Sequence, residues 1–65
     1  MYEKLVGKKV KIVHEDGSHI TVTFGIVEDY DESIKTISIK PTNKTHSVFI
    51  NAKNIQKLEV LEDGN

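Results

Sequence analysis

The chemistry open to this chain rests first on lysine. All nine basic residues are lysines and none is arginine, so the chain lacks the planar guanidinium that grips phosphates and bases with two parallel hydrogen bonds. Lysine ammonium groups can still hold a phosphate backbone without reading its sequence. They can equally keep the outer faces of strands solvated, which is their more common role. The candidates for a basic surface are Lys8, Lys9, Lys11, Lys35, Lys40, Lys44, Lys53 and Lys57.

Acidic side chains gather in one short stretch, Glu28, Asp29, Asp31 and Glu32. They would repel a phosphate backbone, and they lack the ligand spacing of a calcium loop. They can form a surface that faces a protein partner, or they can be ordinary solvated residues of a loop. No serine has an evident histidine and carboxylate to activate it, and the glycines form no phosphate-binding loop. We therefore predict no enzyme, no metal site and no cofactor.

The histidines depend on the register of a hairpin predicted at Asp16-Gly17, a dipeptide typical of tight turns. A two-residue loop there splits the apolar residues between the two faces and pairs His14 with His19 as a candidate metal site. A three-residue loop that adds Glu15 keeps the apolar residues of both strands together and separates the two histidines. We favour the three-residue loop because one face must be buried. We expect three solvent-facing histidines, His14, His19 and His46.

Size and composition limit what the chain can build. With 65 residues, a domain buries only about 60% of its unfolded surface, and the absence of cysteine excludes disulfides as a source of stability. Self-association is the remaining source. No apolar run suits a membrane span or a secretion signal. We expect a cytoplasmic protein with one domain, residues 1–61, and a disordered tail, residues 62–65.

Branched residues indicate an all-β fold, since eight Ile and seven Val stand against three Leu and one Ala. Tyr2, Leu5 and Val6 have helical spacing before Gly7, which predicts a short N-terminal helix. Gly25 interrupts the second strand, where glycine favours a bulge or a bend. The predicted strands cover residues 8–14, 20–29, 34–40, 46–50 and 55–61. A helix followed by five strands, the second of them bent, predicts a strongly bent antiparallel barrel of the SH3-like class.

Two segments resemble the motifs of the Sm and Sm-like family. The first runs from Gly25 through Val27 and Tyr30-Asp31 to Ile34-Lys35, and it matches a motif of glycine, aliphatic, aromatic-Asp and aliphatic-Asn. The second, residues 50–58, matches aliphatic-Arg-Gly-x-Asn-aliphatic-x-x-aliphatic, with Asn51-Ala52 in place of Arg-Gly. The resemblance covers nearly the whole chain and implies an Sm-like barrel with a short N-terminal helix.

The chain departs from the family where the resemblance implies RNA contact. In the family, a base lies between an aromatic or His side chain and an Arg, and an Asn reads its edge. The corresponding residues here are Ser33, Asn51 and Lys35, which offer neither a stacking face nor a guanidinium plane. The usual uridine pocket is therefore absent. The candidate nucleic-acid contacts that remain are Ser33, Lys35, Asn51 and Lys53.

The resemblance also implies assembly. In the family, the fourth strand of one subunit pairs with the fifth strand of the next and closes a ring of six or seven. We expect Phe49 to point outward into such an interface, with a second interpretation that the N-terminal helix covers it together with Tyr2 and Leu5. The candidate interface residues are Val48, Phe49, Ile50, Leu58 and Val60.

These observations predict a non-enzymatic, homo-oligomeric Sm-like module that binds RNA without the family's uridine pocket. The alternative is an SH3-like protein-interaction or regulatory domain with no nucleic-acid role. In that alternative, the acidic stretch from Glu28 to Glu32 faces the partner.

Overall fold

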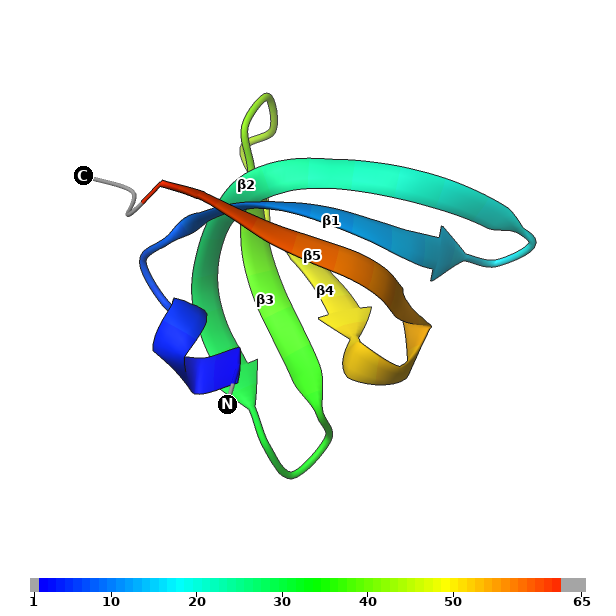
Figure 1. Ribbon diagram of the computed structural model, residues 1–65, viewed down its shortest axis with the longest axis horizontal. Coiled ribbons are helices and arrows are strands. Elements are labelled where there is room, and N and C mark those ends of the chain that lie inside the picture. Colours follow the sequence, from blue (N-terminus) through cyan, green and yellow to red (C-terminus); the bar gives the residue numbers. More distant parts are fainter. Residues whose placement is uncertain (1, 63–65) are drawn as a thin grey trace.

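Five antiparallel strands form one sheet in the order β4-β3-β2-β1-β5 (Figure 1). The structure is a computed structural model and describes residues 2–62. It confirms the predicted all-β class and the number of strands. Its elements are η1 (Tyr2–Leu5), β1 (Lys9–Asp16), β2 (His19–Asp31), β3 (Thr36–Pro41), β4 (Val48–Asn51), η2 (Ala52–Asn54) and β5 (Ile55–Glu62). Glu62 thus belongs to β5, and the rest of the predicted tail, 63–65, lies outside the described residues.

Strand β2 is long enough to serve two partners. Its residues 19–26 pair with β1, and its residues 25–31 pair with β3. Figure 1 shows it curving from the hairpin with β1 round to the turn before β3. Gly25 lies where the two pairings overlap, and a Cβ atom there would collide with the Lys40 carbonyl oxygen. Glycine is needed because β2 and β3 approach too closely for a side chain.

The core consists of branched side chains that point to one face of the bent sheet. Alternation along β1 buries Val10 and Ile12 completely, as the sequence pattern predicts. The same alternation along β3 buries Ile37 and Ile39. Val27 of β2 and Ile50 of β4 complete the buried cluster. The half-buried residues that pack against it are Tyr2, Leu5, Tyr30, Val48, Ile55 and Leu58.

The β1–β2 hairpin differs from both predicted registers. Asp16 pairs with His19, so the two-residue loop is Gly17-Ser18 and Ile12 lies opposite Thr23. Gly17 has a φ of +65°, and glycine at the first central position is the pattern of a type II′ turn. The prediction assumed that the apolar residues of β2 share a face with those of β1. The turn decides otherwise, and it leaves exposed Ile20, Val22 and Phe24.

The alternation of β1 overturns the prediction of three solvent-facing histidines. His14 is 5% exposed, and its Nε2 lies 2.8 Å from the hydroxyl oxygen of Thr23. The core face of β1 carries His14 inward because it follows Val10 and Ile12 at a spacing of two residues. A polar side chain is tolerated there because it has a hydrogen-bond partner. His19, at the end of the hairpin, is exposed.

Two local predictions differ from the structure: the type of the N-terminal helix and the residue at which the third strand begins. The N-terminal segment is a 3₁₀ turn of four residues rather than an α-helix, because so short a segment ends before α-helical hydrogen bonds can add up. Gly7, with a φ of +89°, does end it. The third strand begins at Thr36, and Ile34 and Lys35 lie in the turn before it. Lys35 has a φ of +52°, a left-handed backbone that a strand cannot contain.

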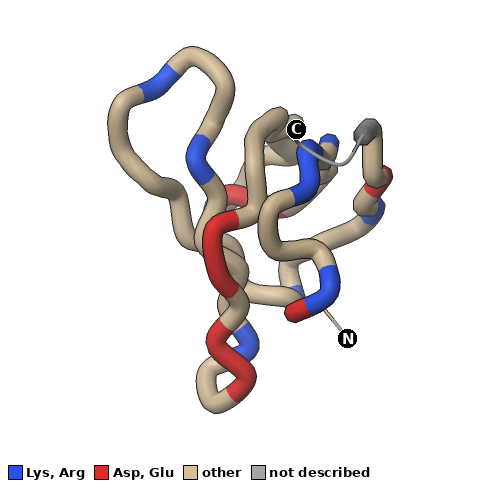
Figure 2. Tube along the Cα trace, turned by 90° about the vertical axis from the view of Figure 1, so that its left-hand side faces the viewer, with Lys and Arg blue, Asp and Glu red and all other residues tan. Residues whose placement is uncertain are grey.

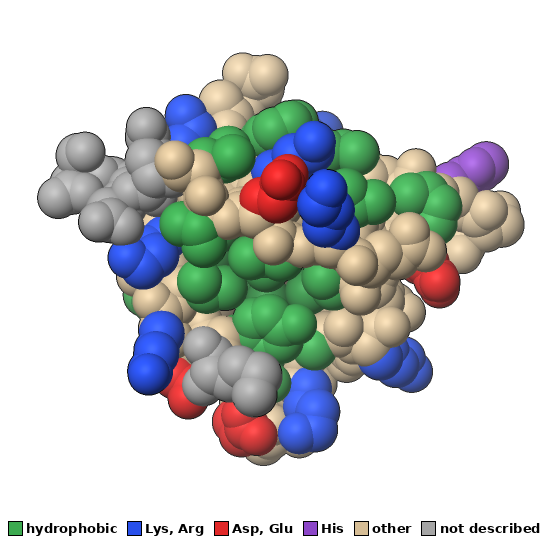
Figure 3. All heavy atoms as spheres, in the orientation of Figure 1, with side chains coloured by type: hydrophobic (Ala, Val, Ile, Leu, Met, Phe, Trp, Pro, Cys, Tyr) green, Lys and Arg blue, Asp and Glu red, His purple; other side chains and the backbone are tan. Residues whose placement is uncertain are grey.

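Hydrophobic side chains remain accessible on several surfaces. Figure 3 shows them gathered in the middle of one face, with charged side chains around them. Val60 and Leu61 of the edge strand β5 are 47% and 48% exposed. A domain of this size leaves such surface uncovered because it has no further layer to place over it. No helix among residues 2–62 is long and apolar enough to cross a membrane.

Candidate functional site

The structure brings the two motif segments into contact through Asn51. Its side-chain amide donates a hydrogen bond of 3.1 Å to the carbonyl oxygen of Ile34, in the β2–β3 turn. Its side-chain oxygen accepts a hydrogen bond of 3.0 Å from the backbone N–H of Lys53 and so caps η2. The backbone N–H of Ala52 donates to the carbonyl oxygen of Lys35 at 2.8 Å. The candidate nucleic-acid contacts therefore lie on two turns that are joined to each other.

Most of these candidate side chains also hold the turns together. The hydroxyl of Ser33 donates to Asp31 Oδ1 at 2.6 Å, and its backbone N–H donates to the same oxygen at 3.0 Å. These hydrogen bonds stabilise the ionised carboxylate and hold the pKa of Asp31 below its ordinary value. Lys35 Nζ lies 3.5 Å from Glu32 Oε2. Lys53 is exposed. The turns thus use Ser33, Asn51 and Lys35 internally.

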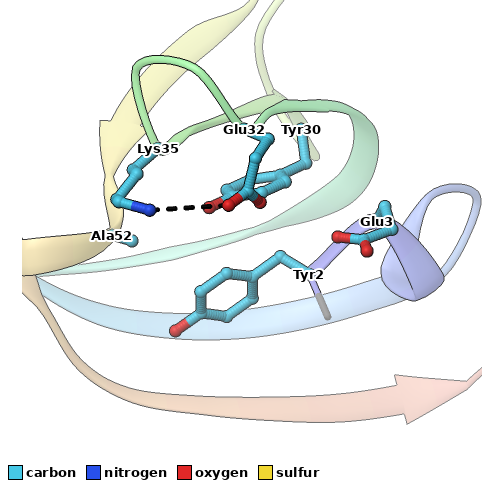
Figure 4. A pocket seen from close by; sticks show the side chains of 6 residues that line it. All are labelled: Tyr2, Glu3, Tyr30, Glu32, Lys35 and Ala52. Atoms are coloured by element: carbon cyan, nitrogen blue, oxygen red, sulfur yellow. Dashed lines mark hydrogen bonds and ion pairs between the residues drawn. The ribbon is translucent and has the colours of Figure 1, made fainter.

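An open hollow beside these turns contains residues that the sequence analysis did not assign to a site. Figure 4 shows the two tyrosine rings, one from η1 and one from the end of β2, with the Lys35–Glu32 ion pair above them. We call this hollow the tyrosine hollow. The ring centroids of Tyr2 and Tyr30 are 5.4 Å apart, and the ring planes are inclined at 55°. The residues that line it are Tyr2, Glu3, Tyr30, Glu32, Lys35 and Ala52.

The surroundings of Tyr30 disfavour a negative charge on its hydroxyl. Partial burial and the carboxylate of Glu32 both raise the pKa of the Tyr30 hydroxyl. The charged groups of its lining are the carboxylates of Glu3 and Glu32 and the ammonium of Lys35, and Glu32 is paired with Lys35. The arrangement offers aromatic faces and carboxylate oxygens, and these are groups that attract cations. The signal in the sequence was that Tyr2 and Tyr30 are the two tyrosines of the chain, but their contact depends on tertiary folding.

The acidic stretch of β2 has a structural role at its first residue. Glu28 Oε1 accepts hydrogen bonds from the hydroxyls of Ser38, at 3.3 Å, and Ser47, at 2.5 Å. It therefore ties β3 and the segment before β4 to β2. Figure 2 shows the acidic positions following one another down a single stretch of chain into a turn. Asp29 and Glu32 are exposed, so this stretch remains available to a partner.

No group of three or more His, Asp or Glu side chains within residues 2–62 is placed to hold a metal ion. His14 lines a small hollow between the β1–β2 hairpin and β4, together with Phe49 and Asn54. Its ring nitrogens face Thr23 and the carbonyl oxygen of Glu15. These contacts give the ring a packing role within the sheet.

The candidate interface residues lie on the two edge strands. On β4, Ile50 is buried and Val48 is half-buried, whereas Phe49 is 71% exposed. The outward direction predicted for Phe49 is confirmed. The second interpretation, that the N-terminal segment covers it, is wrong because Tyr2 of that segment packs against Tyr30 instead. On β5, Leu58 is half-buried and Val60 is 47% exposed.

Comparison with known proteins gives no identification. No family model matches the chain, and neither a curated protein nor a solved structure shows significant similarity to it.

Proposed function

We propose that this protein is a non-enzymatic, Sm-like binding module that assembles with copies of itself through β4 and β5. The observation that carries the proposal is Phe49, a large apolar side chain 71% exposed on an edge strand. An exposed aromatic on an open edge favours strand pairing with another chain. Closure of the bent sheet into an Sm-like barrel, and a cytoplasmic location, belong to the same proposal.

The strand order supports this assembly. Strands β4 and β5 each have one neighbour in the sheet, so each leaves a row of backbone N–H and C=O groups for a partner. Both edge strands carry exposed apolar side chains, since Val60 and Leu61 of β5 are about half exposed and Phe49 of β4 is exposed as well. Pairing β4 of one copy with β5 of the next would cover both edges in a head-to-tail contact that can close into a ring.

The test is the mass in solution, measured by light scattering after gel filtration. We expect the wild-type chain to elute as a multiple of 7.3 kDa and Phe49→Lys to elute as a folded monomer. Phe24→Lys is the matched control, because Phe24 is an exposed phenylalanine on an interior strand of the sheet. It should keep the wild-type mass. A monomeric wild-type chain, or equal effects of the two substitutions, would refute assembly through the β4 edge.

The ligand of the module can be RNA or protein, and the charges favour protein. Lys35 is paired with Glu32, and the exposed carboxylates of Asp29 and Glu32 lie on the same stretch of chain. RNA would therefore be held by lysines elsewhere on the surface, with a steep dependence on salt. Fluorescence anisotropy with labelled oligo-U and oligo-A at low salt distinguishes an RNA ligand from a protein ligand. Binding that weakens sharply with salt supports RNA, and a flat signal leaves the protein-interaction function.

The protein-interaction function has its own test at the acidic stretch. Charge reversal by Asp29→Lys and Glu32→Lys should abolish capture of a protein partner. Glu15→Lys with Asp16→Lys, at the exposed end of β1, is a control of equal charge change. Equal capture by the reversed and wild-type proteins would exclude the acidic stretch as the contact surface.

A further inference from the structure

The tyrosine hollow already holds an ammonium group of the chain itself. Lys35 reaches across the turn so that its Nζ lies 3.5 Å from Glu32 Oε2, and Figure 4 shows this pair among the side chains that line the hollow. The lining of the hollow thus offers a carboxylate and two aromatic side chains to a cation. This combination is what proteins use to recognise alkylated ammonium groups. Lys35 shows where such a group would sit.

The pair between Lys35 and Glu32 is easily displaced. The two side chains are 66% and 73% exposed, and exposed ion pairs contribute little because water and salt screen them. An incoming cation can therefore take the place of Lys35 without a large loss. The lysine stem can move back into solvent, since Glu32 is the partner of its head group within residues 2–62.

The tyrosine rings supply the surface that would retain an apolar cation. Tyr2 and Tyr30 are half-buried against the core, so their rings are held in place before any ligand arrives. Preorganised rings bind without the entropy cost of ordering flexible side chains. The rings meet at an inclination of 55°, which leaves an angled aromatic corner at the side of the hollow. A methylated ammonium suits this corner because it is poorly hydrated and keeps its charge.

We propose that the tyrosine hollow binds a cationic side chain of a protein partner, with a methylated lysine preferred. The alkyl ammonium would pack against Tyr2 and Tyr30, and its charge would face Glu32 in place of Lys35. Once Lys35 is displaced, an anionic ligand such as a nucleotide would meet the carboxylate of Glu32. All lining residues come from one chain, so the site does not require self-assembly, and the failure of either proposal leaves the other standing.

The test uses three probes and NMR of the tyrosine ring protons. The probes are an N-acetylated trimethyllysine amide, its neutral analogue with a tert-butyl head group, and uridine monophosphate. We expect trimethyllysine to shift the ring signals of Tyr2 and Tyr30 saturably, the neutral analogue to bind about fivefold or more weakly, and the nucleotide to have no effect. Equal binding of the neutral analogue, saturable binding of the nucleotide, or no saturable shift with trimethyllysine would overturn the proposal.

Substitutions then assign the contact to named side chains. Tyr30→Leu should abolish the shifts, and Phe24→Leu is the matched control because Phe24 lies on β2 outside the hollow. Lys35→Met removes the competing ammonium and should tighten trimethyllysine binding several-fold. This second variant keeps the proposal testable even where Tyr30→Leu unfolds the domain. Unchanged or weaker binding by Lys35→Met would contradict the displacement of Lys35.

Discussion

Replacing Gly25 by alanine tests the closest backbone approach in the sheet. A Cβ atom at this position would collide with the carbonyl oxygen of Lys40 and lie 2.8 Å from the Cγ2 atom of Ile39. The collision is with the backbone of the neighbouring strand β3, which cannot rotate away as a side chain can. Overpacking of this kind costs about 1–3 kcal/mol, and a rigid partner places Gly25→Ala at about 3 kcal/mol.

That loss is a large share of the free energy of unfolding, which is about 3–10 kcal/mol for a domain of this length. Urea unfolding followed by circular dichroism measures it, and with a slope near 1 kcal/mol per molar the midpoint should fall by about 3 M. Gly17→Ala is the control, since it has a φ of +65° but no neighbouring atom within 4 Å. It should lose only about 1 kcal/mol. A loss at Gly25 no larger than that at Gly17 would refute the steric argument.

Three further predictions concern the joined turns. Lys35→Asn should raise the free energy of unfolding by about 0.5–1 kcal/mol, because Asn tolerates the left-handed backbone at φ +52°; urea unfolding checks this. Asn51→Ala removes the cap of η2 and the bond to the β2–β3 turn and should cost about 1–2 kcal/mol, whereas Asn43→Ala should change stability by less than about 0.5 kcal/mol. Ser33→Ala should raise the pKa of Asp31 toward its ordinary value, as a carboxyl-carbon NMR titration would show. Because the folded-state pKa of Asp31 is lowered, its stabilising effect is present at neutral pH and is lost as the pH falls through that pKa, so the advantage of wild type over Ser33→Ala should vanish in acid.

The elements that the sequence predicts well are those whose pattern is local. Alternation in β1 and β3 correctly indicates that Val10, Ile12, Ile37 and Ile39 are buried, because side chains of a strand point to opposite faces in turn. The bend of the second strand is also predicted from a local signal, because a glycine inside a strand pattern, Gly25, favours a bulge or a bend. The type of helix in the N-terminal segment is harder to predict, since helical spacing does not distinguish one 3₁₀ turn from an α-helix when only a few residues are involved.

The hairpin register and the tyrosine hollow were not predictable from pattern. Asp16-Gly17 indicates a turn, but the loop is Gly17-Ser18, and Ile12 lies opposite Thr23 rather than the expected Ile20. Such a shift by an odd number of residues moves every side chain of β2 to the other face relative to β1. That shift exposes Phe24, whereas the burial of His14 follows from the alternation of β1 itself. Tyr2 and Tyr30 are far apart in the chain, and their contact requires η1 to fold back against the end of β2.

The sequence by itself determined an all-β chain of five strands with a bend at a glycine in the second, because composition and alternation are properties of each segment alone. The direction of Phe49 had two interpretations, and the structure decided between them. Only the tertiary structure decided the pairing of β1 with β2, the use of Ser33 and Asn51 within the turns, and the joining of two tyrosines with Glu32 and Lys35. These depend on which distant segments meet, and that is set by the register and curvature of the whole sheet.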